Sequence, residues 1–283
     1  MDWDSLKQEA VTHLQNLLRI NTTNPPGNEI EAVKYLAGVL DKENIPFQIV
    51  EPSPGRASLV ARLKGNGSKR PLLLTSHIDV VPAEEKEWQY PPFSGHLKDG
   101  FIWGRGAVDM KQMTAMELMV FLAAKREGLS LKRDLIFAAV ADEEAGCKWG
   151  SRWLVEKRPE LIEAEYALNE VGGFSLHIDN HVFYPIGVAE RGVCWFKVKA
   201  RGEPGHGSIP HDNQAVVKIA EAAEKIGVRS LPYHLHPLAG KFISFLAAHQ
   251  KFPRGFILNL LKRPALAGFI LRRLFPDKKQ AKS

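Results

Sequence analysis

The sequence has little cysteine: its 283 residues include only Cys147 and Cys194. Two cysteines cannot build the disulfide framework of many small secreted proteins, so we expect a reducing compartment. The sequence also lacks a run of about 18 apolar residues that could span a bilayer. Its first ten residues, MDWDSLKQEA, lack the basic and then apolar pattern of a signal peptide. These absences predict a cytoplasmic protein without a membrane span.

Acidic residues are scarce in one region, at the end of the chain. Residues 240–283 hold ten Lys or Arg and one acid, Asp277, so the rest of the chain has 28 basic and 31 acidic residues. A nucleic-acid-binding protein more often spreads its basic residues over a folded face, so we expect no nucleic-acid partner. The stretch FILNLLKRPALAGFILRRLF has two interpretations, a membrane-surface helix or a pair of helices of the fold, and we favour the second.

Segments with helical and strand-like patterns alternate over the first 173 residues. Apolar residues recur at helical spacing or in short strand-like runs. Helices are expected at residues 4–20, 29–44, 110–127 and 151–159, and strands at 46–52, 57–65, 72–78, 134–146 and 164–173. This alternation predicts an α/β fold with a mostly parallel sheet flanked by helices.

Polar side chains with ligand chemistry follow three of these apolar strands, and another lies in the loop GRGAVDMK. They are His77, Asp79, Asp109, Glu143, Glu144 and Glu170. In open α/β sheets, sites form beyond the carboxyl ends of the strands, so these side chains can converge at one edge. Histidine nitrogen and carboxylate oxygen are ligands of zinc, and a bound cation would remove the repulsion among the acids.

Each candidate also has a plainer interpretation. His77 alone could be a polar residue at a strand end, Asp109 could be a helix N-cap, and the DEE run could be a solvated turn. Their common placement at one sheet edge favours a metal site. In the tandem pair Glu143 and Glu144, one carboxylate can bind metal while its neighbour acts as a general base.

Four motifs occur in a fixed order, namely SHIDVVP, PPFSGHLKDGFIWGRGAVDMK, ADEEAG and NEVGG. In this order they resemble the M20 family of zinc-dependent exopeptidases and amidohydrolases. That family includes carboxypeptidases, aminoacylases, acetylornithine deacetylases and succinyl-diaminopimelate desuccinylases. The resemblance covers residues 14–200 and continues into ARGEPGHGSIP. It implies a metallopeptidase-like hydrolase that cleaves an amide or peptide bond of a small N-acyl amino acid or peptide.

The resemblance also implies a centre with two zinc ions, for which Co²⁺ or Mn²⁺ are alternatives. His77 and Glu170 would bind one ion, Glu144 would bind the other, and Asp109 would bridge the two. The peptide bond after Asp109 is expected to be cis, as in the family.

Catalytic roles are implied for three further residues. Asp79 would hold the imidazole of His77 by its other nitrogen. Glu143 would be the general base that takes a proton from a metal-bound water and passes it to the leaving amine. His206 matches a lid histidine that, in dimeric relatives, reaches the partner's site and steadies an oxyanion.

The family pattern gives two expected domains, a zinc-exopeptidase-like catalytic domain over residues 1–189 and a partial lid or dimerisation domain over residues 190–283. The lid would begin with a strand from residue 191, carry His206 in a loop and continue with a helix over residues 212–227. We therefore expect a homodimer formed through the lid.

The family also supplies a second zinc-binding histidine near its C-terminus. The later histidines of this chain do not match that ligand: His211, His234, His236 and His249. The expectation is therefore a C-terminally truncated member of the family. The alternative function is a catalytically impaired fragment, or a non-catalytic remnant, that lacks this ligand.

Overall fold

The structure is a computed structural model that describes residues 2–170, 174–187, 196–209, 211–228 and 234–274. The chain divides into two compact units, Met1–Gly172 and Gly173–Ser283. The domain boundary expected between residues 189 and 190 stays a prediction. No helix in these described ranges combines the length and the apolar character that a membrane crossing requires.

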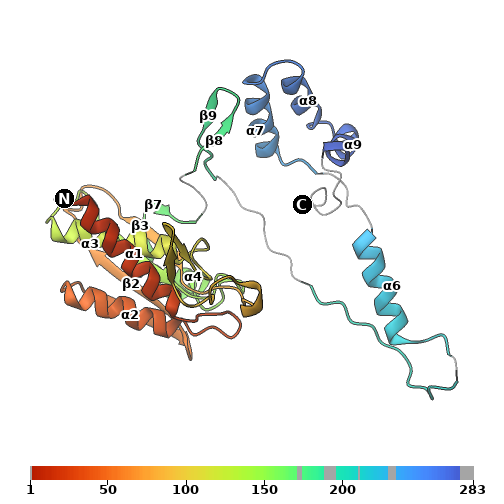
Figure 1. Cartoon of the computed structure of the whole chain (residues 1–283), viewed down its shortest axis with the longest axis horizontal. Coiled ribbons are helices and arrows are strands. Elements are labelled where there is room, and N and C mark those ends of the chain that lie inside the picture. The colour runs from red at the N-terminus through yellow and green to blue at the C-terminus, as the bar shows by residue number, and fades with distance from the viewer. Residues whose placement is uncertain (1, 171–173, 188–195, 210, 229–233, 275–283) are drawn as a thin grey trace. The chain divides into compact units, whose positions relative to one another are not determined.

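The first unit is built on a five-stranded sheet with the strand order β1-β2-β6-β3-β7. Figure 1 labels β2, β3 and β7 of this sheet. Its strands are β1 (Phe47–Ser53), β2 (Arg56–Leu63), β3 (Leu72–His77), β6 (Leu135–Val140) and β7 (Tyr166–Leu168). β3 pairs in parallel with β6 and β7, whereas β2 is antiparallel to β1 and β6. Only β2 therefore runs against the others, and the sheet is mostly parallel, as predicted.

Helices cover both faces of this sheet. They are α1 (Trp3–Arg19), α2 (Glu29–Lys42) and α3 (Lys111–Arg126) on one face, and α4 (Ser151–Lys157) and α5 (Pro159–Ile162) on the other. All six residues of β6 are buried. Phe137 packs in the core with α1–α3, whereas the preceding residue, Ile136, faces the other side of the sheet and packs with Leu154 and Leu161 of α4 and α5. The apolar strand read from the sequence is thus a central strand with two buried faces.

Smaller elements lie in the long connection between β3 and α3. They are the 3₁₀ turn η1 (Glu85–Glu87) and the hairpin of β4 (His96–Lys98) and β5 (Phe101–Trp103). The hairpin turn is made by Asp99 and Gly100, which have φ angles of 53° and 81°. This is the backbone that an Asp-Gly turn favours.

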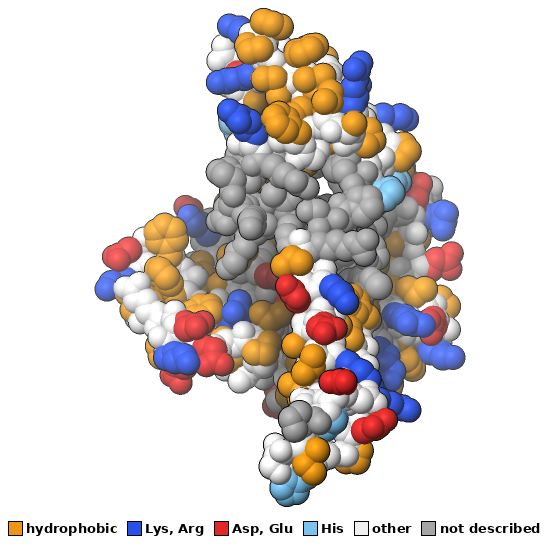
Figure 2. Space-filling view, turned by 90° about the vertical axis from the view of Figure 1, so that its right-hand side faces the viewer, with side chains coloured by type: hydrophobic (Ala, Val, Ile, Leu, Met, Phe, Trp, Pro, Cys, Tyr) orange, Lys and Arg blue, Asp and Glu red, His pale blue; other side chains and the backbone are white. Residues whose placement is uncertain are grey.

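The described residues of the second unit form a β-hairpin and four helices. They are β8 (Leu176–Ile178), β9 (His181–Phe183), α6 (Ala215–Val228), α7 (Pro237–Ala248), α8 (Arg254–Leu260) and α9 (Pro264–Leu274). Phe183 of the hairpin packs against Phe245 and His249, at the end of α7. At the top of Figure 2, exposed hydrophobic side chains lie among Lys and Arg side chains over α7–α9. The helix expected at residues 212–227 is present as α6, and the expected helix pair as α8 and α9.

One element of the second unit differs from the sequence expectation. Residues 191–195 of the expected lid strand lie outside the described residues, and residues 196–200 form no strand. A strand is stabilised by a paired neighbour. In the described part of this unit, β8 and β9 pair only with each other, so residues 196–200 have no strand beside them.

Candidate metal centre

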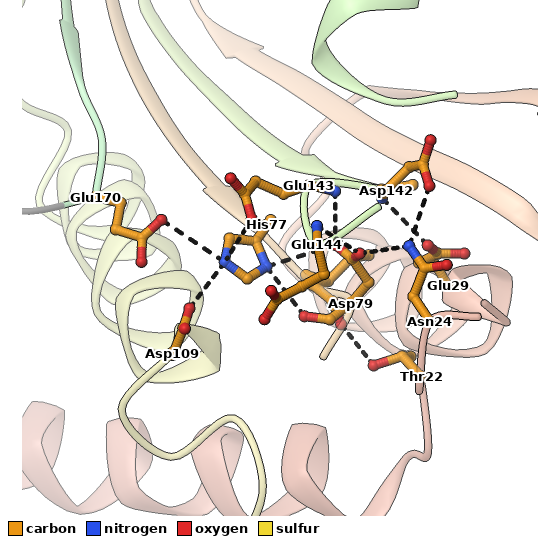
Figure 3. Close-up of polar contacts among 12 residues, drawn as sticks. Thr22, Asn24, Glu29, His77, Asp79, Asp109, Asp142, Glu143, Glu144 and Glu170 are labelled. Carbon is orange, nitrogen blue, oxygen red and sulfur yellow. Dashed lines mark hydrogen bonds and ion pairs between the residues drawn. The ribbon is translucent and has the colours of Figure 1, made fainter. Parts of the chain in front are cut away.

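His77, the last residue of β3, presents its imidazole at the carboxyl edge of the sheet. The side chain is only 2% exposed, because β3 lies between β6 and β7. Its Nδ1 atom lies 3.0 Å from the backbone oxygen of Asp79 and 3.4 Å from the carboxylate of that residue. The Nε2 atom is therefore turned toward a group of acidic side chains (Figure 3).

Four carboxylates, which we call the acidic rim, lie round this Nε2 atom. They belong to Asp109, Glu143, Glu144 and Glu170. The Nε2 atom is 3.1 Å from Asp109, 3.8 Å from Glu143 and 3.7 Å from Glu170. Two triads each have ligand atoms within 4.8 Å of one another: His77 with Asp109 and Glu144, and His77 with Glu143 and Glu170. The ligand candidates read from three strand ends and one loop therefore lie together.

The acidic rim crowds negative charge round one imidazole. Burial raises the pKa of Glu144 to about 7, and Asp109 adds to this while His77 opposes it. Burial also raises the pKa of Glu170, with His77 opposing and Asp109 adding. Burial by itself lowers the pKa of the His77 imidazole, but Asp79 and two rim carboxylates outweigh it and raise that pKa to about 9. A divalent cation would supply the positive charge that this cluster lacks.

Asp109 lies in the loop before α3, and local contacts fix this loop. The peptide bond between Asp109 and Met110 is cis, which confirms the expectation from the family resemblance. Gly106 has a φ of +90°, and a Cβ at this position would lie 2.8 Å from the Val80 side chain. Lys111 is fully buried, and its ammonium donates hydrogen bonds of 3.0 and 2.7 Å to backbone oxygens at the C-terminal end of α1. The loop is therefore anchored to that helix.

Glu143 and Glu144 lie in the loop that follows β6. Their backbone N–H groups donate hydrogen bonds of 3.0 and 3.1 Å to the two carboxylate oxygens of Asp79. The loop returns so close to β6 that a Cβ on Gly150 would overlap the backbone oxygen of Ala141. Asp79 thus contacts the imidazole on one side and this loop on the other, so it fixes the position of both relative to each other.

A second group of polar residues, which we call the buried frame, includes Asp79 and lies behind it. The frame consists of Asn24, Glu29, Arg56, Asp79 and Asp142 (Figure 3 labels all but Arg56). Arg56 donates to the two carboxylate oxygens of Glu29 at 2.7 and 2.8 Å and to Asp142 at 2.7 Å. Asn24 donates to Asp142 at 3.0 Å and to Asp79 at 2.8 Å. Each residue is at most 9% exposed, so these hydrogen bonds replace hydration.

Sequence reasoning identified Asp79 but no other residue of the buried frame. Asn24 lies in the loop NTTNPPGN, and Glu29 and Arg56 begin a helix and a strand, where charged residues are common. The one available signal was Arg56 at the start of a strand whose next residues, ASLVA, are apolar or small. Its partners lie 27 and 86 residues away in the sequence, so no local spacing indicates them.

His206 lies in the second unit, away from regular structure. Its Nδ1 atom is 2.8 Å from the hydroxyl of Ser208. It lines a pocket of that unit together with Glu203 and His211. The role expected for His206, to steady an oxyanion, stays a prediction.

The donor set fits a divalent cation. One imidazole nitrogen and several carboxylate oxygens are the ligands that zinc accepts. In the described part of the chain, the Oε1 atom of Glu144 is buried without a hydrogen-bond partner. A cation between Glu144, Asp109 and His77 would satisfy this atom and separate the charges of the two carboxylates.

Comparison with known sequences identifies the family of this chain. Residues 73–265 match the family model described as peptidase family M20/M25/M40. The chain is 35% identical over 222 residues to aminoacylase-1 of Sus scrofa, covering 77% of this chain and 53% of that protein. It is 30% identical over 217 residues to a probable succinyl-diaminopimelate desuccinylase of Staphylococcus epidermidis, and this match covers 75% of this chain and 49% of that protein. The chain spans about half the length of these relatives.

Comparison with solved structures supports the fold. An M20 family metallo-carboxypeptidase from Sulfolobus solfataricus matches with a TM-score of 0.53 and 24% sequence identity. The match covers 61% of this chain and 38% of that one. The family model matches more than half of the 283 residues. The chain therefore belongs to peptidase family M20/M25/M40.

Proposed function

We propose that this protein is a metal-dependent hydrolase that cleaves an amide or peptide bond of a small N-acyl amino acid or peptide. Membership of the family and similarity to aminoacylase-1 support this reaction class. The observation that carries the proposal is the cluster of one buried imidazole and four carboxylates at a single sheet edge.

In this proposal, His77, Asp109, Glu144 and Glu170 would hold the cation or cations, and the family resemblance assigns Asp109 to both ions. Zinc is the expected metal because the donors are imidazole and carboxylate, and Co²⁺ or Mn²⁺ are alternatives. When bound, such a cation supplies a Lewis acid that polarises the amide carbonyl and makes water more acidic.

Glu143 is the general base in this proposal. Its side chain is 45% exposed, so water and substrate can reach the carboxylate, which lies 3.8 Å from the His77 imidazole. The carboxylate takes a proton from the attacking water as the C–O bond forms. It returns the proton to the amine nitrogen as the C–N bond breaks. Asp79 keeps the imidazole oriented throughout, because its backbone oxygen and its carboxylate both face Nδ1.

A second candidate function is that of a catalytically impaired protein that binds one cation. The two candidate triads share the single imidazole of His77. One Nε2 atom cannot serve two ions at full strength, and zinc sites normally have at least three protein ligands. On this alternative, one ion binds tightly and turnover is negligible.

Two measurements on the purified full chain separate these functions. After removal of metal with a chelator, the protein is titrated calorimetrically with Zn²⁺ and assayed with a panel of N-acyl amino acids and dipeptides. We expect cation binding and turnover, with turnover lost in Glu143→Gln and retained in the control Glu31→Gln, which changes an exposed carboxylate on α2. One bound equivalent without turnover supports the impaired protein, and no cation binding contradicts both functions.

We also propose a homodimer formed through the lid and a cytoplasmic location. The first rests on the family resemblance around His206 and the second on the sequence. Sedimentation velocity of the purified chain at several concentrations tests the first, and a monomer at all of them would contradict it.

A further inference from the structure

The Asn24 side chain occupies a position that the proposed chemistry does not use. The residue is 3% exposed, and its amide nitrogen lies between two carboxylates. It donates one hydrogen bond of 2.8 Å to Oδ2 of Asp79 and another of 3.0 Å to Oδ1 of Asp142. Both amide hydrogens are thus used on acidic residues that come from different strand ends (Figure 3).

Backbone contacts fix this amide relative to Asp79. The backbone N–H of Asn24 donates to the oxygen of Val80 at 2.8 Å, and the N–H of Val80 donates to Thr22 at 3.2 Å. The hydroxyl of Thr22 donates to the oxygen of Ile78 at 2.6 Å. Residues 22–24 therefore lie against residues 78–80 on both sides of Asp79, and the Asn24 side chain has little freedom to move away from it.

The same amide fixes the loop that carries two rim carboxylates. Asp142 begins this loop, and its other oxygen, Oδ2, accepts a hydrogen bond of 2.9 Å from the backbone of Trp149 near the end of the loop. Arg56 donates a hydrogen bond of 2.7 Å to Oδ1 of Asp142, the same oxygen that accepts from Asn24. Within the part of the chain that the structure describes, Asn24 is the side chain that donates to both Asp142 and Asp79, and Asp79 in turn contacts the imidazole of His77.

The chemistry of an amide suits this place. A lysine or arginine there would neutralise Asp79, whereas a neutral donor orients the carboxylate and leaves its negative charge directed at His77. A carboxylate behind a ligand imidazole raises the basicity of that imidazole toward a metal. An apolar residue would leave two buried carboxylates each short of one hydrogen bond.

We propose that Asn24 is a positioning residue of the metal centre, which sets the position of the loop carrying Glu143 and Glu144 relative to His77 by joining Asp79 to Asp142. This inference rests on the proposed metal-binding function. Its consequence is that loss of the amide weakens cation binding, although Asn24 is not a ligand. Removal of such supporting hydrogen bonds typically lowers metal affinity about 10- to 100-fold.

The test measures Zn²⁺ affinity and stability on the same full-length proteins. Wild type, Asn24→Leu and the control Asn16→Leu are titrated with Zn²⁺ in competition with a chelator, and their metal-free forms are melted by circular dichroism. Asn16 is matched because its amide donates a part-buried hydrogen bond of 3.0 Å to Tyr35 in the same unit. We expect Asn24→Leu to bind Zn²⁺ about 10- to 100-fold more weakly and Asn16→Leu to stay within about twofold of wild type.

The outcomes separate the inference from the function on which it rests. Wild-type affinity in folded Asn24→Leu, or an equal loss in Asn16→Leu, would overturn the positioning role and leave metal binding intact. Absence of Zn²⁺ binding in wild type would overturn both. If Asn24→Leu does not fold, Asn24→Ser replaces it, because one hydroxyl donor can serve only one of the two carboxylates. If Asn24→Ser binds Zn²⁺ more weakly than Asn16→Leu does but still binds it, the positioning role is supported. If its Zn²⁺ affinity equals that of wild type, the role is overturned.

Discussion

The buried frame and the acidic rim lie on opposite sides of one imidazole, and they accommodate charge differently. In the frame, Arg56 lies between Glu29 and Asp142, and hydrogen bonds replace the water that burial removes. In the rim, the carboxylates converge on His77, and burial with mutual repulsion raises the pKa values of Glu144 and Glu170. The protein itself supplies the hydrogen-bond donors of the frame, whereas in the proposed function a cation would offset the charge of the rim.

The frame and the rim therefore have different roles at the site: the frame fixes positions, and the rim carries negative charge. The frame connects residues of the first loop, α2, β2 and the loops after β3 and β6, so in the proposed function it would position the ligands before a cation binds. In the proposed function, the rim supplies the negative charge that would attract a cation, and the repulsion among its carboxylates destabilises the metal-free protein. Substitutions in the frame should therefore lower both stability and affinity, whereas substitutions in the rim should change them in opposite directions.

The largest effect is expected for Arg56→Met. The change removes the guanidinium group that pairs with the buried carboxylates of Glu29 and Asp142. Loss of one partner of a buried ion pair typically lowers the free energy of unfolding by about 3–5 kcal/mol. Urea unfolding at pH 7, followed by circular dichroism, measures the change in the free energy of unfolding.

The control for this prediction is Arg152→Met, which breaks the exposed pair of Arg152 with Glu156. Exposed ion pairs are screened by water and contribute little to stability, so this variant should stay close to wild type. Equal costs for the two substitutions would show that the frame contributes no more than an ordinary surface pair.

The second prediction concerns Glu117 on α3, which is as buried as the frame but forms no ion pair in the described residues. Burial raises the pKa of Glu117 to about 7, and the hydroxyl of Ser76 and the backbone of Thr75 oppose the shift. The unfolded chain releases this proton near pH 4.5, but the folded protein retains it to about pH 7. The free energy of unfolding should therefore fall by about 2–3 kcal/mol between pH 4.5 and 8 on account of this group.

Unfolding curves at pH 5 and pH 8 for wild type and Glu117→Gln test this. The rim also titrates in this range, so the quantity compared is the pH-dependent loss of stability in each protein. We expect the loss to be smaller in Glu117→Gln, and unchanged in the exposed control Glu31→Gln. An identical pH dependence in Glu117→Gln and wild type would show that burial without a cationic partner imposes no such cost.

The rim and the core could be read from the sequence because both follow from local patterns. An apolar run predicts a central strand such as β6, and its carboxyl end predicts the place of Glu143 and Glu144. The order of the strands was not predictable in this way, because it depends on contacts between distant segments. The β4–β5 hairpin was missed although its Asp99–Gly100 turn was a usable local signal.

The frame could not be read from the sequence because its physics is not local. Asn24 and Asp142 are 118 residues apart, and only the folded sheet brings them to hydrogen-bond distance. Nothing in the loop NTTNPPGN distinguishes Asn24 from an ordinary turn residue. Short motifs thus predict the residues that touch a ligand more readily than the residues that hold those in place.

The smallest expected change in stability, and the most diagnostic in sign, belongs to Glu144→Gln in the rim. Burial, Asp109 and other nearby carboxylates raise the pKa of Glu144 to about 7, so its charged form destabilises the metal-free protein at pH 8. The side chain is partly exposed, and solvent screening reduces the expected gain in the free energy of unfolding on neutralisation to about 1 kcal/mol.

The same variant loses a proposed ligand oxygen, so Zn²⁺ affinity should fall at least about tenfold, as it does when weaker supporting contacts are removed. Urea unfolding of the metal-free protein and competition titration with Zn²⁺ measure the two quantities. If metal-free Glu144→Gln is less stable than wild type, the charge of Glu144 stabilises the protein, as the charges of the frame do. If its Zn²⁺ affinity is unchanged, Glu144 is not a ligand.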